Sequence, residues 1–442
     1  IIRNGVGIMK RKVAFKTLGC RLNQFETDAL VTEFKKGDYE VVGFNQKADV
    51  YVVNTCTVTN QSDHKSRNLV SQAAKKTRDA VIVVTGCMVN NDREVVEQRN
   101  DVTYAVDNAQ KSSIFPLVEG HFKGEVVHPD AFQPDLFRFE PATLGFHTRS
   151  SIKIQDGCDN FCTFCIIPKV RGRATSRPVN EIIQNINQVL ALGSKEIVLT
   201  GVNIGRYNFG NTGFEDLLEM ILDLPGDFRV RISSIEPEGI GKKFYSLVNH
   251  PKLCPHLHLC LQSGSDKILL QMRRMYNLAS YKSMVENIRK NKADFNFTTD
   301  IIVGFPGETE EDFNETCRIA NKLEFSHIHT FKYSVRKGTR AERMPEQIPE
   351  RIKTKRSQII RSISDDNKAT YRNKFVGRKE KVLIEKIRNG EATGYSHCFN
   401  PYKIYSQHIK KNTFVEVRSS ETRHENGEIF MVVDNGYKSS PD

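Results

Sequence analysis

Short runs rich in β-branched residues alternate with amphipathic helical stretches over two long parts of the chain, residues 12–110 and 151–334. Strand–helix–strand alternation of this kind predicts parallel strands in a sheet that helices cover on both faces. In the first part we expect strands at 13–18, 49–53 and 80–84, with helices that include 23–36 and 62–76. The predicted fold class is therefore α/β, beginning with a parallel α/β domain at the N-terminus.

The second part contains six strand-like runs separated by helical runs. Six successive βα units can form a central open (β/α)6 barrel, in which the chemistry gathers at the strand ends. We expect its strands at 152–155, 196–200, 228–235, 257–262, 297–304 and 327–333, and its helices to include 179–192, 214–222, 278–291 and 310–323.

The pattern changes again near the C-terminus, where a basic helical stretch precedes five short strands separated by turn residues. Closely spaced short strands are typical of a small all-β barrel. Several prolines and phenylalanines also break the periodicity after the first domain, as in a linker. We therefore divide the chain into an N-terminal domain (9–126), a linker (127–148), a barrel core (149–350), a basic helical connector (351–377) and a C-terminal β-barrel (378–442).

The composition is that of an ordinary globular protein. Hydrophobic residues make up 38% of the 442 positions and charged residues 27%. No apolar run approaches the roughly 18 residues that a membrane-spanning helix needs. Residues 1–8, which precede Met9, lack an apolar segment followed by a small-residue cleavage site. We therefore expect a cytoplasmic protein with no membrane partner.

Positive charge is concentrated in one stretch. The net charge is +12, and residues 351–380 contribute +7 of it, from ten Lys or Arg and three Asp or Glu. A concentrated basic stretch favours a polyanionic partner. The alternative is a solvated basic face of a helix.

Three cysteines follow the first strand of the barrel core in the pattern Cys158-x3-Cys162-x2-Cys165. A compact loop can point three thiolates at one iron–sulfur cluster, and a 4Fe–4S cluster would then keep one iron free. Structural zinc normally has four ligands, and neither Cys nor His lies at residues 166–171. Disulfides are disfavoured because cytosolic thiols stay reduced.

Three further cysteines, Cys20, Cys56 and Cys87, each follow a predicted strand by two or three residues. Parallel strands place such positions on one edge of the sheet, where Gly19 and Gly86 permit a tight backbone. The trio therefore predicts either a second cluster with an open iron or three structural cysteines. We expect the remaining cysteines to be small buried side chains or idle thiols without a partner at metal spacing: Cys254, Cys260, Cys317 and Cys398.

With these two trios and this domain order, the chain resembles the radical S-adenosylmethionine methylthiotransferases from about Lys10 to Val433. Within that family, Thr17-Leu-Gly-Cys-Arg-Leu-Asn-Gln-Phe-Glu-Thr27, Asn54-Thr-Cys-Thr-Val-Thr-Asn60 and Lys65-Ser-Arg67 look most like the branch that acts on N6-threonylcarbamoyladenosine in tRNA. The resemblance implies a radical SAM core and a terminal RNA-binding barrel of the TRAM type.

The resemblance also implies two 4Fe–4S clusters and S-adenosylmethionine as cofactors. The cofactor would bind the free iron beside Cys158, Cys162 and Cys165 and be cleaved to a 5′-deoxyadenosyl radical. The second cluster, on Cys20, Cys56 and Cys87, would hold the sulfur that, once methylated, replaces a hydrogen on C2 of the adenine. The implied substrate is the adenosine next to the anticodon (position 37), so the partners are a tRNA anticodon stem-loop, an external electron donor and a sulfur source.

Further candidate residues lie at predicted strand ends. We expect Thr200, Gly201, Ser234, Glu236 and Gln262 to contact the amino-acid and ribose parts of the cofactor. The loop at 302–308, with Ile302 and Gly304, resembles one that approaches the cofactor's adenine in radical enzymes. The alternative for this loop is an ordinary turn in which Thr309 and Asp312 begin the next helix with a capping box.

Three other sets of residues have two possible roles each. Arg171, Arg173 and Arg177 contact RNA phosphate or anchor the cysteine loop through ion pairs. His256 and His258, two residues apart on one strand, are packed or hydrogen-bonded rather than metal ligands. Tyr395, Phe399 and Tyr402 stack on RNA bases or fill the core of the β-barrel.

Three alternative functions follow from the same motifs. Two keep the methylthiolation chemistry and change the substrate, to isopentenyladenosine in tRNA or to an aspartate of a ribosomal protein. The third is a non-catalytic iron–sulfur protein that binds RNA.

Overall fold

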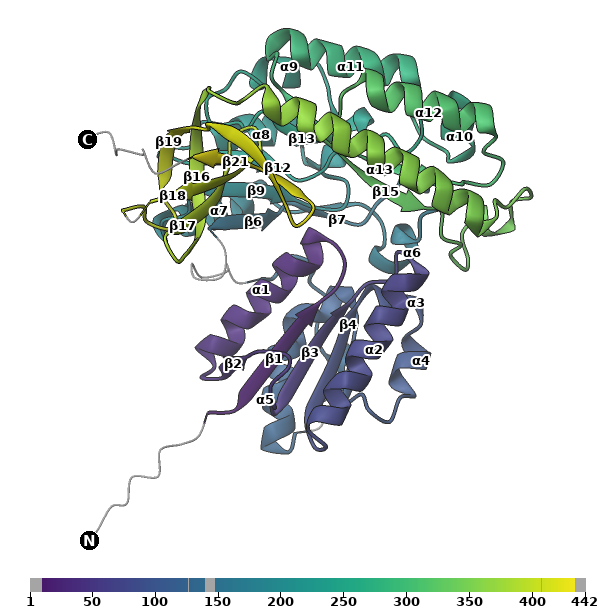
Figure 1. Cartoon of the computed structure of the whole chain (residues 1–442). Helices are drawn as coiled ribbons and strands as arrows, with labels where there is room; N and C mark the ends of the chain where they lie inside the picture. Colours follow the sequence, from purple (N-terminus) through teal and green to yellow (C-terminus); the bar gives the residue numbers. More distant parts are fainter. Residues whose placement is uncertain (1–9, 126, 140–147, 407, 434–442) are drawn as a thin grey trace. The chain divides into compact units, whose positions relative to one another are not determined.

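The computed structural model describes residues 10–125, 127–139, 148–406 and 408–433 (Figure 1). The chain forms two compact units. The first unit contains residues 1–143, 156–158 and 165–173, and the second contains 144–155, 159–164 and 174–442. The predictions for residues 1–8, for the C-terminal part of the linker (140–147) and for the end of the β-barrel (434–442) lie outside the described residues.

The first unit is built on a parallel five-stranded sheet in the order β2-β1-β3-β4-β5. Alternate residues of each strand pack on opposite faces, so that Val50 and Val52 join one apolar cluster and Tyr51 and Val53 the other. This burial on both faces confirms the predicted parallel α/β domain. Its main elements are β1 (Lys12–Thr17), α1 (Arg21–Lys36), β2 (Glu40–Val42), β3 (Val50–Thr55), α2 (Asn60–Lys76), β4 (Val81–Gly86), α3 (Cys87–Asn91), α4 (Arg93–Glu97), β5 (Tyr104–Val106) and α5 (Ile114–Lys123).

The second unit contains six parallel core strands in two three-stranded groups, β12-β9-β6 and β13-β14-β15. Isolated bridges from Val230 to Leu253 and from Ile235 to Leu259 connect the groups. This arrangement confirms the open (β/α)6 barrel. The strands are β6 (Arg149–Lys153), β9 (Glu196–Thr200), β12 (Arg229–Ile232), β13 (His256–His258), β14 (Asn296–Val303) and β15 (His327–Lys332).

Helices pack on the outer face of these strands, where one large apolar cluster forms the core of the unit. The longest helix, α13 (Glu350–Asn373), starts at Pro349, as a proline with a fixed φ favours. The second unit also contains α7 (Val179–Ala191), α8 (Phe214–Leu222), α10 (Asp266–Gln271), α11 (Leu278–Asn291) and α12 (Glu310–Lys322), whereas α6 (Ile167–Arg171) belongs to the first unit. No described helix is both long enough and apolar enough to cross a membrane.

The predicted C-terminal β-barrel is a six-stranded sheet in the order β19-β16-β17-β18-β21-β20. Its strands are β16 (Lys379–Arg388), β17 (Glu391–Ser396), β18 (Pro401–Tyr405), β19 (Phe414–Arg418), β20 (Glu421–Glu425) and β21 (Glu428–Val433). The sequence did not predict β20, because its residues Glu-Thr-Arg-His-Glu are polar. Asn426 and Gly427, both at positive φ, join β20 to β21 as an Asn-Gly hairpin turn.

A buried ion group ties the C-terminal sheet to the core strands within the second unit. Glu196 of β9 accepts hydrogen bonds from Arg229 (2.5 Å) and Arg231 (2.8 Å) of β12, and all three side chains are at most 1% exposed. Both arginines also donate to backbone carbonyls at residues 395–397. Burial alone would raise the pKa of Glu196, but the two arginines hold it well below its usual range.

We expect Glu196→Gln to lower the free energy of unfolding by about 3 kcal/mol, because two buried arginine charges lose their counter-ion. Urea denaturation measures this difference. Asp227→Asn is the control: Asp227 pairs with Lys381 at the surface (3.1 Å), where water screens the pair, and the loss should stay within about 0.5 kcal/mol. Equal stabilities of the two variants would contradict the assignment of the ion group as a support of the fold.

Candidate functional site

Three cysteines of the first unit lie at the same edge of its parallel sheet. Cys20 follows β1 and precedes α1, Cys56 follows β3, and Cys87 directly follows β4. Because β1, β3 and β4 are neighbours at roughly 4.8 Å spacing, the edge spans about 10 Å from the first of these strands to the last. Cys56 and Cys87 are buried, and Cys20 is exposed. The predicted convergence of the three strand ends is confirmed.

Side-chain amides and hydroxyls fix the three strand ends relative to one another. The Asn23 amide of α1 donates to the carbonyls of Leu18 (2.8 Å) and Thr55 (3.0 Å), and thereby joins the ends of β1 and β3. The Thr55 hydroxyl donates to the Thr85 carbonyl of β4 (2.5 Å). Ser66 of α2 accepts from the Cys56 amide (3.3 Å) and donates to its carbonyl (3.1 Å). The strand ends are therefore held by polar contacts and do not depend on backbone pairing alone.

Two glycines permit this close approach. Gly19 and Gly86 have φ values of +98° and +101°. A Cβ on Gly86 would lie 2.4 Å from the Thr55 carbonyl oxygen, and one on Gly19 would lie 2.9 Å from Cys56 Cβ. Both the left-handed backbone and the available space therefore require glycine, as the sequence predicts.

Buried charges surround the same edge. Arg171 of α6 donates to Asp156 (2.9 Å) and Glu26 (3.1 Å), and Lys111 contacts the other oxygen of Glu26. These side chains are at most 1% exposed. Burial raises the pKa of the Cys87 thiol, and the positive charges of Arg171 and Lys111 act against that shift.

The ion-pair interpretation therefore holds for Arg171, which is not available to RNA. Arg177 is buried as well, and it is bonded to Glu181 (3.3 Å) and Asn185 (3.0 Å) of α7. Arg173 is exposed.

The cysteine trio of the first unit fits a multi-atom cluster better than a single metal ion. Among the described residues, only His258, Cys260 and Asp300 bring three ligand-type atoms within 4.8 Å of one another. The sulfurs of Cys20, Cys56 and Cys87 are thus spread more widely than the ligands around one zinc ion.

The loop with Cys158, Cys162 and Cys165 is anchored at separate points. In the first unit the Cys158 amide donates to the Gly172 carbonyl (3.1 Å). In the second unit Thr163 donates from its amide to the Met272 carbonyl (3.1 Å) and from its hydroxyl to the Gln271 carbonyl (2.9 Å). Cys162 is buried, whereas Cys158 and Cys165 are half-buried. Each part of the loop is therefore held by its own unit.

The candidate cofactor-binding residues lie at the carboxyl ends of the core strands. Thr200 ends β9 and is buried, with Gly201 next to it, while Ser234 and Glu236 follow β12 and are half-buried. Gln262 follows β13 and has a φ of +67°, which is unusual for a residue with a side chain and is often found at functional sites.

Gln262 and Ile302 lie side by side, because the Ile302 amide donates to the Gln262 carbonyl (2.9 Å). Gly304 follows β14, and the space beside its Cα is filled by Lys353 of α13, 2.4 Å from where a Cβ would lie. The capping box of Thr309 and Asp312 is present at the start of α12. The loop at 302–308 thus also makes the ordinary turn that was the alternative.

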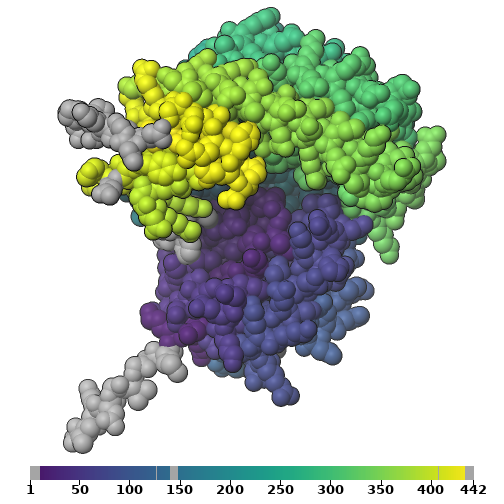
Figure 2. Space-filling model, in the orientation of Figure 1, coloured from purple at the N-terminus to yellow at the C-terminus, as the bar shows by residue number. Residues whose placement is uncertain are grey.

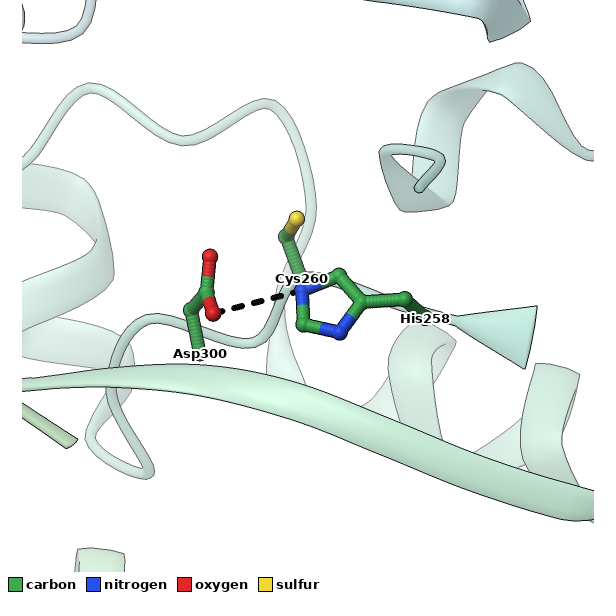
Figure 3. A group of neighbouring side chains, drawn as sticks. All are labelled: His258, Cys260 and Asp300. Carbon is green, nitrogen blue, oxygen red and sulfur yellow. Dashed lines mark ion pairs between the residues drawn. The ribbon is translucent and has the colours of Figure 1, made fainter. Parts of the chain in front are cut away.

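Two features of the second unit escaped the sequence reasoning. One is Arg274, whose Nη1 donates to the sulfur of Cys162 (3.1 Å). The other is the group in Figure 3, in which Cys260, buried as the sequence predicts, lies near His258 and Asp300.

His258 is nevertheless hydrogen-bonded at both ring nitrogens, as the sequence predicts. Its Nε2 lies 3.2 Å from Asp300 and its Nδ1 lies 3.0 Å from the Thr298 hydroxyl. His256 packs against the ring of Phe399, with centroids 4.8 Å apart. Two members of the group in Figure 3, His258 and Asp300, therefore pair with each other.

Known proteins match this chain along most of its length. The Uncharacterized protein family UPF0004 matches residues 12–107, and the Radical SAM superfamily matches residues 152–320. The threonylcarbamoyladenosine tRNA methylthiotransferase MtaB of Thermotoga maritima is 34% identical over 92% of this chain and 95% of its own length. The enzyme of the same name from Aquifex aeolicus is 37% identical over 84% of this chain and 92% of its own length.

The chain belongs to the radical SAM methylthiotransferases. This methylthiotransferase is also similar to the tRNA-2-methylthio-N(6)-dimethylallyladenosine synthase of Fusobacterium nucleatum, at 34% identity over 93% of this chain and 98% of that protein. Its fold resembles that of the radical S-adenosylmethionine methyltransferase TsrM from Kitasatospora setae, with a TM-score of 0.53 at 15% identity, over 73% of this chain and 75% of that one. As a family member it uses two 4Fe–4S clusters and S-adenosylmethionine.

We expect Gly86→Ala to disrupt the edge beside Cys87, because the new Cβ meets the Thr55 backbone. Iron in the anaerobically reconstituted protein should fall from about eight to about four atoms per chain, since each cluster holds four. Gly124→Ala is the matched control: Gly124 also has a positive φ, +78°, but open space beside it. Full iron content in Gly86→Ala would show that this edge does not hold a cluster.

Proposed function

We propose that this methylthiotransferase converts N6-threonylcarbamoyladenosine at position 37, next to the tRNA anticodon, to its 2-methylthio derivative. The observation that carries the proposal is the full-length similarity to MtaB enzymes, which covers the N-terminal cysteine domain as well as the radical core. Two cysteine-bearing motifs support the same assignment, one at 17–27 and the other at 54–60. Both lie at the same edge of the parallel sheet. The enzyme would act in the cytoplasm and draw on an external electron donor and a sulfur source.

We assign the two cysteine trios to the two clusters. Cys158, Cys162 and Cys165 would hold the radical cluster, and Cys20, Cys56 and Cys87 the auxiliary cluster. When bound, the clusters and S-adenosylmethionine supply the radical and the methylthio group needed to replace an unactivated aromatic hydrogen.

The residues of the chain would orient these groups and shield them from water. Burial of Cys56 and Cys87 keeps solvent from two of the three auxiliary ligands. The buried charges of Arg171 and Lys111 favour the thiolate form that a cluster requires. Thr200, Gly201, Ser234, Glu236, Gln262, Ile302 and Gly304, at the carboxyl ends of the core strands, would position the cofactor.

A tRNA substrate needs a cationic surface. The exposed cationic surface on α13 is smaller than the number of basic residues at 351–380 suggests. Most of the basic side chains at 351–380 are occupied within the fold; Arg356, for example, pairs with Glu308 (2.6 Å), and Lys353 donates to the Tyr333 carbonyl (3.1 Å). Arg351, Lys355 and Arg361 are exposed and form no ion pair within the described residues. They would contact phosphates and make binding dependent on salt.

The C-terminal barrel packs, through β20 and β21, against the C-terminal end of the same helix within the second unit (Figure 2). Its aromatic residues are occupied, however. Tyr402 is fully buried in the barrel core, and Tyr395 stacks on Phe399 with ring centroids 4.7 Å apart. Arg231 lies over the Phe399 ring at 4.6 Å. We therefore assign the barrel a role in holding RNA through its surface, without base stacking on these three residues.

The substrate can be tested in cells. In a strain from which the gene for this chain is deleted, 2-methylthio-N6-threonylcarbamoyladenosine should be lost from digested tRNA, and its unmethylthiolated precursor should accumulate. Mass spectrometry of the nucleosides measures both. Loss of 2-methylthio-isopentenyladenosine, or of the methylthio group on a ribosomal-protein aspartate, would assign the enzyme to the alternative substrate instead.

Substitutions in the two cysteine trios should block different steps of the reaction. Cys162→Ala should abolish cleavage of S-adenosylmethionine to 5′-deoxyadenosine and leave the auxiliary cluster in place. Cys56→Ala should retain cleavage but yield no methylthio product. Anaerobic assays of both products on tRNA distinguish the two, with Cys317→Ala, a half-buried cysteine of α12, as the control. Full product yield from both variants would reject the two-cluster assignment, and absence of cleavage in the wild type would favour a non-catalytic iron–sulfur protein.

A further inference from the structure

Arg274 connects a cluster ligand to a candidate cofactor residue through one buried guanidinium. Its Nη1 donates to Cys162 Sγ (3.1 Å), and its Nη2 donates to the carboxylate of Glu236. Its Nε donates to the Tyr276 hydroxyl (3.2 Å). Only 8% of the residue is exposed, so water screens these contacts weakly. All four residues belong to the second unit.

The turn after α10 holds this guanidinium in place. The Arg274 amide donates to the Leu269 carbonyl (2.9 Å), which closes the end of the helix behind it. The Tyr276 hydroxyl, which accepts from the arginine, donates in turn to the Leu261 carbonyl (2.7 Å). The same turn receives the cysteine loop, because Thr163 donates to the carbonyls of Gln271 and Met272. The arginine and the loop are therefore fixed to one piece of backbone.

A hydrogen bond from a buried cation to a cluster sulfur has an electronic consequence. Each electron that enters an iron–sulfur cluster adds negative charge, part of which resides on the cysteine sulfurs. A fixed positive donor lowers the cost of that charge, and hydrogen bonds to the sulfurs are among the factors that set cluster potentials. The second arm of the guanidinium fixes the carboxylate of Glu236 at the end of β12, where the cofactor is expected.

We propose that Arg274 is a positioning residue that raises the reduction potential of the radical cluster through Cys162 and holds Glu236 in its cofactor-binding orientation. This inference rests on the assignment of Cys162 as a ligand of that cluster. Lysine cannot take over both tasks, because its single ammonium lacks the planar fork that reaches two acceptors.

The test is a redox titration of the reconstituted full-length protein, followed by electron paramagnetic resonance with and without S-adenosylmethionine. The signal that responds to the cofactor identifies the radical cluster. In Arg274→Met the fraction of that cluster reduced at a fixed low potential should fall roughly tenfold, the size expected when one hydrogen bond to a charged group is lost. Arg274→Lys should recover part of the loss. Arg273→Met, at the exposed neighbouring position, is the matched control and should titrate like the wild type.

The outcomes separate this inference from the proposed function. A wild-type protein with no cofactor-responsive signal would overturn the cluster assignment itself. A normal wild-type signal, together with Arg274→Met or Arg274→Lys titrating at the wild-type potential, would overturn the role of Arg274 alone. If Arg274→Met loses iron, the test is made on Arg274→Lys, because this variant keeps the positive charge. A wild-type reduction potential in Arg274→Lys overturns the proposal.

Discussion

Parallel pairing of β1, β3 and β4 is the constraint on which the candidate chemistry of the first unit depends. The register aligns Val13 with Val50 and Val50 with Val81, so the three strands end at one edge. Cysteines that are 36 and 31 positions apart in the sequence thereby become neighbours. An antiparallel strand would carry its cysteine to the opposite edge. Both faces of β3 and β4 are buried, and this burial fixes the register, because a shift by one residue would exchange the two packed faces.

The buried charges at that edge make the cysteine segments interdependent. Arg171 lies six positions after Cys165, and its carboxylate partners are Asp156, two positions before Cys158, and Glu26, in the helix that begins after Cys20. Loss of the arginine would remove the cation that Asp156 and Glu26 share and leave Glu26 with Lys111 alone, which is more costly in a buried site than loss of a surface pair. Within the first unit, Asp156 and Arg171, which flank the motif of Cys158 and Cys165, are thus held by α1, the helix that follows Cys20.

Periodicity and strand ends could be predicted from the sequence because they are local properties. Runs of β-branched residues predicted β1, β3 and β4. Because these strands are parallel, the cysteines that come after them were predicted at one edge of the sheet. The polar strand β20 was missed because it has no apolar alternation, although Asn426-Gly427 signals its hairpin. The partners of Arg171 and Arg274 could not be predicted, because Glu26 and Cys162 lie 145 and 112 positions away. Nothing near an arginine in the sequence indicates which distant carboxylate or sulfur the fold will bring to it.

The same limit applies to the basic stretch, where charge in the sequence overstates charge at the surface. Arg356 is buried against Glu308, and Arg372 against Glu428, so these cations stabilise the fold and cannot attract RNA over a distance. At 100° per residue, Arg351, Lys355 and Arg361 fall within an arc of about 120° on α13. Three phosphate contacts on one face orient a nucleic acid but do not read its sequence. Under the proposed function, discrimination between modified adenosines would therefore have to come from parts of the chain other than its basic helix.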